Sequence, residues 1–232
     1  MKNNVNFEWD SLIRSTYWGQ IYNSTILDSE WLINKSISPG RWAVGYEFLY
    51  VLYRVLDEVK PNSILELGLG QSSKLTTQYA IKDGVQHDIV EHDMEWVSFF
   101  TSSWKYFSNN TLVNVCPLKE AVHNNQKYLR YDNFDKVVDE KKYNLIIVDG
   151  PFGGDFEASR RDILSHIPDI LDKDFVVLFD DCGRPGERNT VQDFINMLNN
   201  IGIENYNGVY NGGGIKITIA VTSKSWKWLT SL

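Results

Sequence analysis

The stretch SILELGLGQSSKL, residues 63–75, places a short apolar strand directly before a turn that contains two glycines. Gly68 and Gly70 lack the Cβ atom that would otherwise keep a ligand away from the backbone of this turn. In the dinucleotide-binding pattern a third glycine follows, which lets the next helix pack closely behind a pyrophosphate. Here serine follows instead, beginning at Ser72. The turn therefore predicts a bound cofactor but disfavours a nicotinamide dinucleotide.

An acidic residue follows at the distance at which such folds bind the ribose of an adenosine. Glu91 ends the second apolar run, and 91 − 70 = 21 residues separate it from Gly70. A carboxylate at the end of this strand can accept hydrogen bonds from both ribose hydroxyls. The segment EHD, residues 91–93, leaves Asp93 as an alternative for the same role.

Strand and helix patterns alternate after residue 62, which indicates a parallel sheet with helices on both faces. The final segment, 205–223, departs from this pattern, because two strand-like runs joined by NGGG predict an antiparallel hairpin. Short apolar runs predict buried strands over 63–69, 87–93, 111–116, 143–150 and 174–181. The stretches between them predict helices over 73–84, 94–107, 120–129 and 160–171.

The predicted fold class is α/β: a Rossmann-like, doubly wound, mostly parallel seven-stranded sheet with a C-terminal antiparallel hairpin. Residues 1–60 lack clear strands and predict an N-terminal helical cover, which belongs to the same domain as the cofactor-binding part, 61–232. Helical spacing is clear over 46–59, and Pro61 ends that helix. An earlier apolar helix face is expected to cover the sheet or a partner subunit in a homodimer; it comprises Trp9, Leu12, Ile13, Tyr17 and Ile21.

Composition excludes several classes of function. The formal net charge is 23 − 30 = −7, so a nucleic-acid partner is not expected. No apolar run approaches the ~18 residues of a membrane span, and the N-terminus does not resemble a signal peptide. Cys116 and Cys182 are expected to be free thiols of a cytoplasmic protein, and no histidine spacing predicts a zinc site.

The combination ILELGLGQSS…VEHD resembles the first two motifs of class I S-adenosylmethionine-dependent methyltransferases. The resemblance spans roughly residues 40–222, and it implies S-adenosylmethionine as the cofactor of the 61–232 part. It implies that Glu66 lies near the methionine end and that Glu91 binds the ribose. The remaining cofactor contacts implied by the resemblance are Arg41, Gly45, Gly68, Gly70, Ser72, His92, Leu118 in CPL (116–118), and Asp149.

Three carboxylates end two neighbouring strands and should face one cleft. Asp149 follows the run 143–148, and Asp180 and Asp181 follow the run 174–179. Crowded carboxylates must share a proton, bind a cation or pair with arginine. Nearby arginines that can pair with them are Arg160, Arg161, Arg184 and Arg188.

Methyl transfer to a hydroxyl requires the attacking oxygen to lose its proton, to a carboxylate base or with the help of a divalent metal. The spacing 180 − 149 = 31 resembles the metal-binding positions of catechol-type O-methyltransferases. That resemblance implies Asp149, Asp180 and Asp181 as ligands of Mg²⁺ or Mn²⁺, the cations that oxygen ligands favour. Asp181 departs from the usual Asn of that group, so a mechanism without metal, in which Asp149 or Asp181 acts as the base, remains an alternative.

The pattern DGP…RRDIL…FDDCGRPGE is similar to a bacterial group of methyltransferases that are distantly related to polysaccharide-modifying O-methyltransferases. This similarity implies a hydroxyl of a sugar or glycan precursor as the acceptor. Arg161 or Arg184 is then expected to bind an acidic group of the acceptor, such as a uronate or a phosphate.

Two other functions remain open from the residues alone. An NAD-dependent oxidoreductase would share Glu91 but would prefer the third glycine and a further parallel strand after residue 182. A non-catalytic binding protein on the same fold would keep the glycine turn without needing the three acids.

Overall fold

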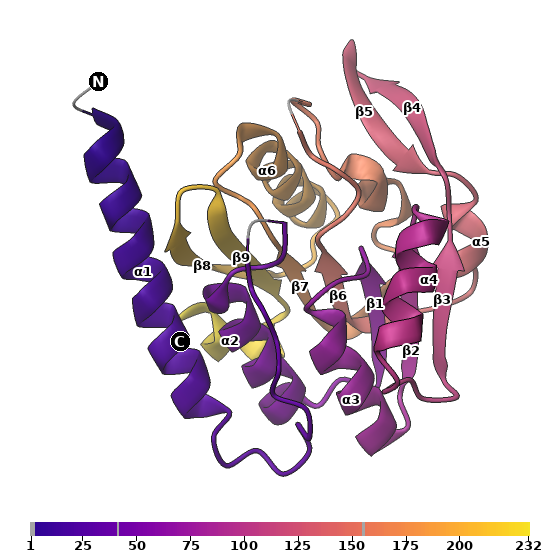
Figure 1. The fold of residues 1–232 in the computed structure, drawn as a ribbon. Coiled ribbons are helices and arrows are strands. Elements are labelled where there is room, and N and C mark those ends of the chain that lie inside the picture. Colours follow the sequence, from indigo (N-terminus) through magenta and orange to yellow (C-terminus); the bar gives the residue numbers. More distant parts are fainter. Residues whose placement is uncertain (1–2, 41, 155) are drawn as a thin grey trace.

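The computed structural model describes residues 3–40, 42–154 and 156–232, with only the backbone described for residues 3–8. Its centre is one seven-stranded sheet in the order β3-β2-β1-β6-β7-β9-β8 (Figure 1). All neighbours from β3 to β7 are parallel, whereas β9 runs antiparallel to both β7 and β8. The strands are β1 (Ser63–Leu67), β2 (Gln86–Glu91), β3 (Thr111–Val115), β6 (Tyr143–Val148), β7 (Leu171–Phe179), β8 (Tyr206–Gly213) and β9 (Lys216–Thr222).

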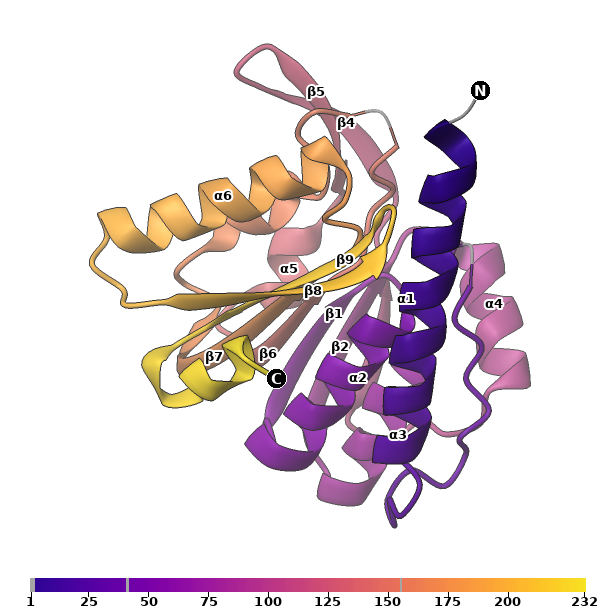
Figure 2. The same ribbon diagram turned by 90° about the vertical axis from the view of Figure 1, so that its left-hand side faces the viewer.

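The central strands are apolar on both faces because helices cover the sheet on both sides. Helices α1 to α4 lie on one side, and α5 and α6 lie on the other (Figure 2). Alternate residues of β1 show this: Ile64 belongs to the core under α2 and α3, and Leu65 to the core under α5 and α6. The helices are α1 (Asn3–Thr25), α2 (Tyr46–Arg54), α3 (Ser73–Asp83), α4 (Met94–Ser103), α5 (Phe134–Val138) and α6 (Pro185–Asn200).

The order of the strands creates a switch point between β1 and β6. The chain runs outward from β1 to β3 and then returns to pair β6 with the other side of β1. Loops on the two sides of such a point diverge, which leaves room for a ligand at the carboxyl ends of the strands. The predicted α/β fold with a terminal antiparallel hairpin is confirmed.

The prediction of a helix over 120–129 is wrong. This segment forms a separate two-stranded antiparallel hairpin of β4 (Leu118–His123) and β5 (Gln126–Tyr131). The turn between the strands is Asn124-Asn125, and both residues have positive φ, 49° and 64°. Asparagine adopts this left-handed conformation more readily than most residues, and two in succession favour a hairpin turn.

The predicted helix over 160–171 is also shorter than expected. Only a 3₁₀ helix, Arg161–His166, forms there, and Leu171 already begins β7. The helix predicted over 46–59 is confirmed as α2, which continues into a π-helical turn, Val55–Val59.

The N-terminal helix packs through a different face from the one predicted. Of the predicted face, Trp9, Leu12, Ile13 and Tyr17 are 57–65% exposed. The residues of α1 that contact the core are Trp18, Ile21 and Tyr22, near its C-terminal end, and Ile26 follows directly after the helix. Only Ile21 belongs to both sets, so most of the predicted face does not cover the sheet, and its alternative role, the covering of a partner subunit, stays a prediction.

Two further expectations can be compared with the structure. Cys116 and Cys182 are buried and free, as expected. Within residues 3–40, 42–154 and 156–232, no helix is both long enough and apolar enough to cross a membrane.

Candidate functional site

The glycine turn after β1 brings the backbone close to the end of β6. Gly68 has φ +99°, and a Cβ atom there would lie 3.4 Å from backbone atoms of Asp149 and Gly150. Gly70 differs, because a Cβ atom there would meet no protein atom within 4 Å. The turn therefore requires glycine at 68 for the fold, while the side of the turn at Gly70 is open.

Glu66 does not reach the open side of the turn. Its buried carboxylate accepts hydrogen bonds from hydroxyls at the start of α3 and lies close to a histidine of β2. This places Glu66 beneath the turn, where its hydrogen bonds connect β1 to α3, and its position near the methionine end of a cofactor stays a prediction. The contacts are Ser72 Oγ at 2.6 Å, Ser73 Oγ at 3.0 Å, Thr76 Oγ1 at 2.8 Å and His87 Nε2 at 3.3 Å.

Glu91 lies at the end of β2 beside this turn, as predicted. Its Oε2 accepts a hydrogen bond from the backbone N–H of Leu69 at 2.9 Å, and its Oε1 accepts from that of His92 at 2.7 Å. Burial acts to raise the pKa of Glu91, but the hydrogen bonds from His92, Leu69 and Asp93 outweigh it and lower the pKa. Glu91 is therefore an ionised carboxylate, the form that accepts hydrogen bonds from a diol.

The alternative acid, Asp93, is engaged elsewhere. Its side chain caps α4 by accepting hydrogen bonds from the backbone N–H groups of Glu95 and Trp96. An N-cap residue satisfies backbone donors that have no partner within the helix. The geometry thus favours Glu91 over Asp93 as the ribose-binding acid.

The other predicted cofactor residues lie at several places around this turn. His92 Nδ1 is 2.6 Å from Glu91 Oε1, and its ring meets Phe152 edge-on at 4.6 Å. Leu118 begins β4 and is half-buried against the core under α5 and α6. Gly45 is the N-cap residue of α2. Arg41 lies outside the described residues.

Tyr131 is a residue of this region that the sequence did not reveal, because it ends β5, a strand that was not predicted. It is fully buried, and its hydroxyl has no hydrogen-bond partner among the described residues. A Cβ atom at Gly150 would lie 2.3 Å from this hydroxyl, so Gly150 makes room for it. The same glycine approaches Gly68, which places Tyr131 beneath the glycine turn.

The three predicted acids come together at the carboxyl edge of the sheet. Asp149 directly follows β6, and Asp180 and Asp181 directly follow β7. One carboxylate oxygen of each lies within 4.8 Å of one of each of the others. The parallel pairing Val148↔Phe179 explains this, because it aligns the ends of the two strands.

A buried arginine holds these acids, but it is Arg160 and not Arg161. Arg160 has φ +56°, and its Nη2 lies 3.2 Å from Asp149 Oδ1 and 3.0 Å from Asp181 Oδ2. Arg161 turns away and pairs with Asp193 of α6, so the structure does not bring it to the acids. Arg184 reaches them as predicted, with Nη1 3.1 Å from Asp181 Oδ2.

Lys216 is the second residue that sequence reasoning missed. It begins β9, and its Nζ lies 2.6 Å from Asp181 Oδ1 and 3.3 Å from Asp180 Oδ2. Its distance from the acids along the chain hides the contact, which forms because the terminal hairpin pairs with β7. The only signal in the sequence was the position of this lysine at the start of a strand expected beside β7.

Burial and neighbouring charges shift the pKa values of the three acids in different directions. Burial raises the pKa of Asp149 well above its usual range, and the charge of Asp180 adds to this effect. Burial also raises the pKa of Asp180, although Lys216 opposes it. Burial acts in the same direction on Asp181, but Arg160 and Lys216 outweigh it and lower the pKa. Of the three, Asp181 therefore favours its ionised form most and Asp149 favours its protonated form most.

The oxygen atoms that could bind a divalent cation are largely occupied by basic side chains. Three carboxylates at this spacing are the hard ligands that Mg²⁺ and Mn²⁺ prefer. Both oxygens of Asp181, however, already contact basic side chains, as does one oxygen each of Asp149 and Asp180. A metal would have to displace Lys216 and compete with Arg160, so the arrangement does not fit a resident divalent cation.

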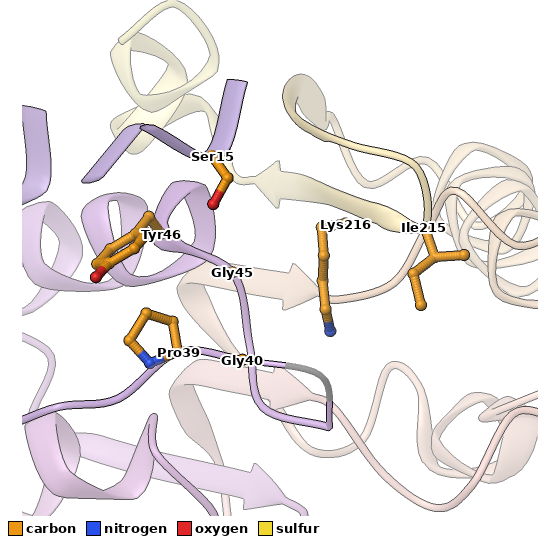
Figure 3. A pocket seen from close by; sticks show the side chains of 7 residues that line it. All are labelled: Ser15, Pro39, Gly40, Gly45, Tyr46, Ile215 and Lys216. Carbon is orange, nitrogen blue, oxygen red and sulfur yellow. The ribbon is translucent and has the colours of Figure 1, made fainter. Parts of the chain in front are cut away.

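Lys216, which contacts Asp180 and Asp181, also lines a pocket of about 300 Å³ (Figure 3). The Lys216 side chain extends from the beginning of β9 into it, between Ile215 and the segment that carries Pro39, Gly40 and Gly45. Tyr46 and Ser15, from α2 and α1, complete the lining. The pocket therefore lies between the N-terminal cover and the terminal hairpin.

Glu47 is buried next to this pocket. A Cβ atom at Gly45 or Gly212 would lie 2.2 Å from its Oε2, so the carboxyl occupies a slot between two glycines. Its Oε1 has no hydrogen-bond partner in the described part of the chain. Burial and the nearby charge of Asp180 raise the pKa of Glu47 to about 8, which leaves it mostly protonated at neutral pH.

No protein-family model and no curated protein matches this chain. Solved structures show a similar fold at low sequence identity. One is the methyltransferase PaMTH1 of Podospora anserina, solved with SAH bound, with 14% identity, TM-score 0.52 and coverage of 91% of this chain and 88% of that one. An O-methyltransferase of Bacillus cereus in complex with SAH has 14% identity, TM-score 0.51 and 91% coverage of both chains. The precorrin-6y C5,15-methyltransferase of Geobacter metallireducens has 12% identity, TM-score 0.51 and coverage of 82% and 95%.

Proposed function

We propose that this protein is an S-adenosylmethionine-dependent O-methyltransferase whose acceptor is a hydroxyl of a sugar or glycan precursor. The observation that carries the proposal is the position of the acid cluster, Asp149, Asp180 and Asp181, on the same edge of the sheet as the glycine turn and Glu91. A methyl donor bound along the turn would place its methyl group next to this cluster. Structural neighbours with SAH bound support the choice of donor.

The residues around the turn would bind the methyl donor, and the acceptor would react with its methyl group. Glu91 would accept hydrogen bonds from the ribose hydroxyls, and the open backbone at Gly70 would lie along the ligand. S-adenosylmethionine supplies a methyl group on a positively charged sulfur. The acceptor oxygen would form a bond to this methyl carbon while the carbon–sulfur bond breaks and its electron pair stays on the sulfur of S-adenosylhomocysteine.

The proton of the acceptor hydroxyl also needs a destination. Asp180 Oδ1 is buried and has no hydrogen-bond partner among the described residues, and burial raises the pKa of Asp180. A carboxylate whose pKa is raised is a stronger base, so Asp180 suits the role of general base. Arg160 would hold Asp149 and Asp181 in place beside it.

A sugar acceptor is supported by the character of the adjoining pocket. Tyr46 supplies an aromatic side chain to the lining, and aromatic faces pack well against sugar rings. Lys216 and the nearby Arg184 provide positive charge for an acceptor that carries a uronate or a phosphate. Arg184 thus keeps the role predicted for it, whereas Arg161 does not share it.

The experiment that tests the function combines calorimetry and turnover. We expect the protein to bind S-adenosylhomocysteine and not NAD, and to transfer labelled methyl groups to one member of a panel of nucleotide sugars and glycan fragments. Binding of NAD without S-adenosylhomocysteine would instead support the oxidoreductase alternative. Binding of S-adenosylhomocysteine with no transfer to any acceptor class would support a non-catalytic protein.

Substitution of the proposed base separates chemistry from cofactor binding. Asp180→Asn should reduce turnover by about 10²-fold or more and leave the affinity for S-adenosylhomocysteine unchanged. The matched control is Asp193→Asn, at an aspartate of α6 that pairs with Arg161 away from the cluster. Wild-type turnover of Asp180→Asn would remove this residue from the mechanism.

A further inference from the structure

Lys216 stands where the cation of a metal-dependent site would stand. Its Nζ lies between two of the three acids, 2.6 Å from Asp181 Oδ1 and 3.3 Å from Asp180 Oδ2. Its side chain is only 18% exposed, and those of Asp180 and Asp181 are 0% and 6% exposed. A cation held this close by two buried carboxylates is strongly attracted, because little water screens the charges.

Two arginines compensate the acids in addition to Lys216. Arg160 is buried, and its guanidinium contacts Asp149 and Asp181. Arg184 contacts Asp181 and also Glu187. Removal of Lys216 would leave two buried carboxylates with less compensation, which is a strongly unfavourable state.

We infer that Lys216 takes the place of a divalent metal in this acid cluster and that its ammonium holds the acceptor oxygen during methyl transfer. An ammonium group has three N–H donors. Asp180 and Asp181 accept two of them, and no other partner is found for Lys216 among the described residues. The third donor is available to a ligand, because Lys216 is one of the residues that line the pocket (Figure 3).

This position would give Lys216 two effects on an acceptor hydroxyl. Its donor would orient the oxygen, and its positive charge would stabilise the alkoxide character that develops as the proton leaves for Asp180. A divalent metal supplies the same two effects in a metal-dependent enzyme. The assignment of the acceptor oxygen rests on the proposed function, whereas the exclusion of a metal by Lys216 can be tested without any turnover.

The test measures Mn²⁺ binding to the full chain by electron paramagnetic resonance, after treatment with a chelator. Wild-type protein should leave the signal of free Mn²⁺ unchanged. Lys216→Gln should bind one Mn²⁺ per chain, with an affinity at least about tenfold higher than that of the wild type, because Asp180 and Asp181 lose the ammonium group that contacts them. Lys216→Arg keeps a positive charge at this position and should bind no more Mn²⁺ than the wild type.

The control is Lys224→Gln, at an exposed lysine that follows the opposite end of β9 and pairs with Glu204. It should behave as the wild type. Calorimetry with S-adenosylhomocysteine shows whether Lys216→Gln is folded, since its affinity should match that of the wild type. Failure of the wild type to bind S-adenosylhomocysteine would defeat the proposed function but not the result with Mn²⁺.

Two results would overturn the inference. One is a wild-type protein that binds one Mn²⁺ per chain and loses it on Asp180→Asn. The other is a folded Lys216→Gln protein that gains no Mn²⁺ binding, since Lys216 would then not be what excludes the metal. Once the acceptor is identified, Lys216→Gln should also raise the KM for the acceptor and lower kcat. Added Mg²⁺ should leave the turnover of the wild type unchanged.

Discussion

Glu47 shows at the scale of one residue how burial and charge act together. Glu47 is 1% exposed, and its carboxyl lies in a slot between Gly45 and Gly212. The nearby charge of Asp180 further disfavours its ionised form. An ionised carboxylate without compensating partners is costly in such a place. The protein avoids the cost by raising the pKa of Glu47 to about 8.

This shift predicts how stability changes with pH. Between pH 4.5 and about 8 the folded state binds the proton of Glu47 more tightly than the unfolded state does. The contribution of Glu47 to stability is therefore present below pH 4.5 and lost as the pH rises through about 8. Glu47→Gln should gain roughly 2–4 kcal/mol relative to wild type between pH 4.5 and pH 9, measured by urea unfolding.

The control for this pH series is Glu204→Gln, at an exposed glutamate that pairs with Lys224. It should follow the wild-type pH dependence. An equal response of Glu47→Gln and wild type to pH would contradict a proton on Glu47 in the folded state.

Arg160 and Arg161 show how a single backbone conformation decides the make-up of a site. They are neighbours in the sequence, and the pattern RRD does not separate them. The left-handed backbone of Arg160, with φ +56°, directs one guanidinium to the acids and leaves Arg161 to pair with α6. No spacing rule applied to the sequence reveals this conformation.

At the scale of elements, the β4–β5 hairpin is where local sequence was most misleading. Residues 120–129 contain Glu, Ala, Gln, Lys and Leu, which favour helices. Asn124 and Asn125 outweigh these preferences, because two successive residues with positive φ close a tight turn. The antiparallel pairing then continues from His123↔Gln126 to Leu118↔Tyr131, which buries Tyr131 beneath the glycine turn.

This turn predicts an asymmetric response to substitution. Asn125→Val should destabilise the hairpin by about 1–2 kcal/mol, because a β-branched side chain tolerates positive φ poorly. Asn125→Gly keeps the conformation and should be neutral or slightly stabilising. Hydrogen exchange of the β4 and β5 amides measures the effect. Equal exchange in both variants would show that the turn does not require positive φ.

At the scale of the whole molecule, α1 is joined to the sheet as part of one core. The Trp18 indole donates a hydrogen bond to the backbone oxygen of Asn211 at 2.9 Å, and its ring packs against Tyr50 and Tyr210. These contacts connect α1, α2 and β8, which lie far apart in the sequence. We therefore propose that residues 1–60 fold together with 61–232 as one domain.

A pair of substitutions tests this proposal. Trp18→Ala should reduce the free energy of unfolding by about 2–3 kcal/mol, because it removes a half-buried aromatic ring from the junction. Trp9→Ala removes a tryptophan that is 59% exposed on the same helix, and its effect should stay within about 0.5 kcal/mol. Thermal unfolding should remain a single transition in both variants. Two separate transitions would show that the N-terminal part folds independently.

The sequence by itself determined the order of the strands around the glycine turn, the position of Glu91 at the end of β2 beside that turn, and the three acids after β6 and β7. These features depend on neighbours in sequence and on the rule that parallel strands end at one edge, so local patterns were enough. Only the tertiary structure decided the cation among the acids. Lys216 lies 35 residues from Asp181 along the chain and meets it because the terminal hairpin adds antiparallel to β7. A contact between side chains that far apart depends on the register of the sheet, which the sequence of either segment does not specify.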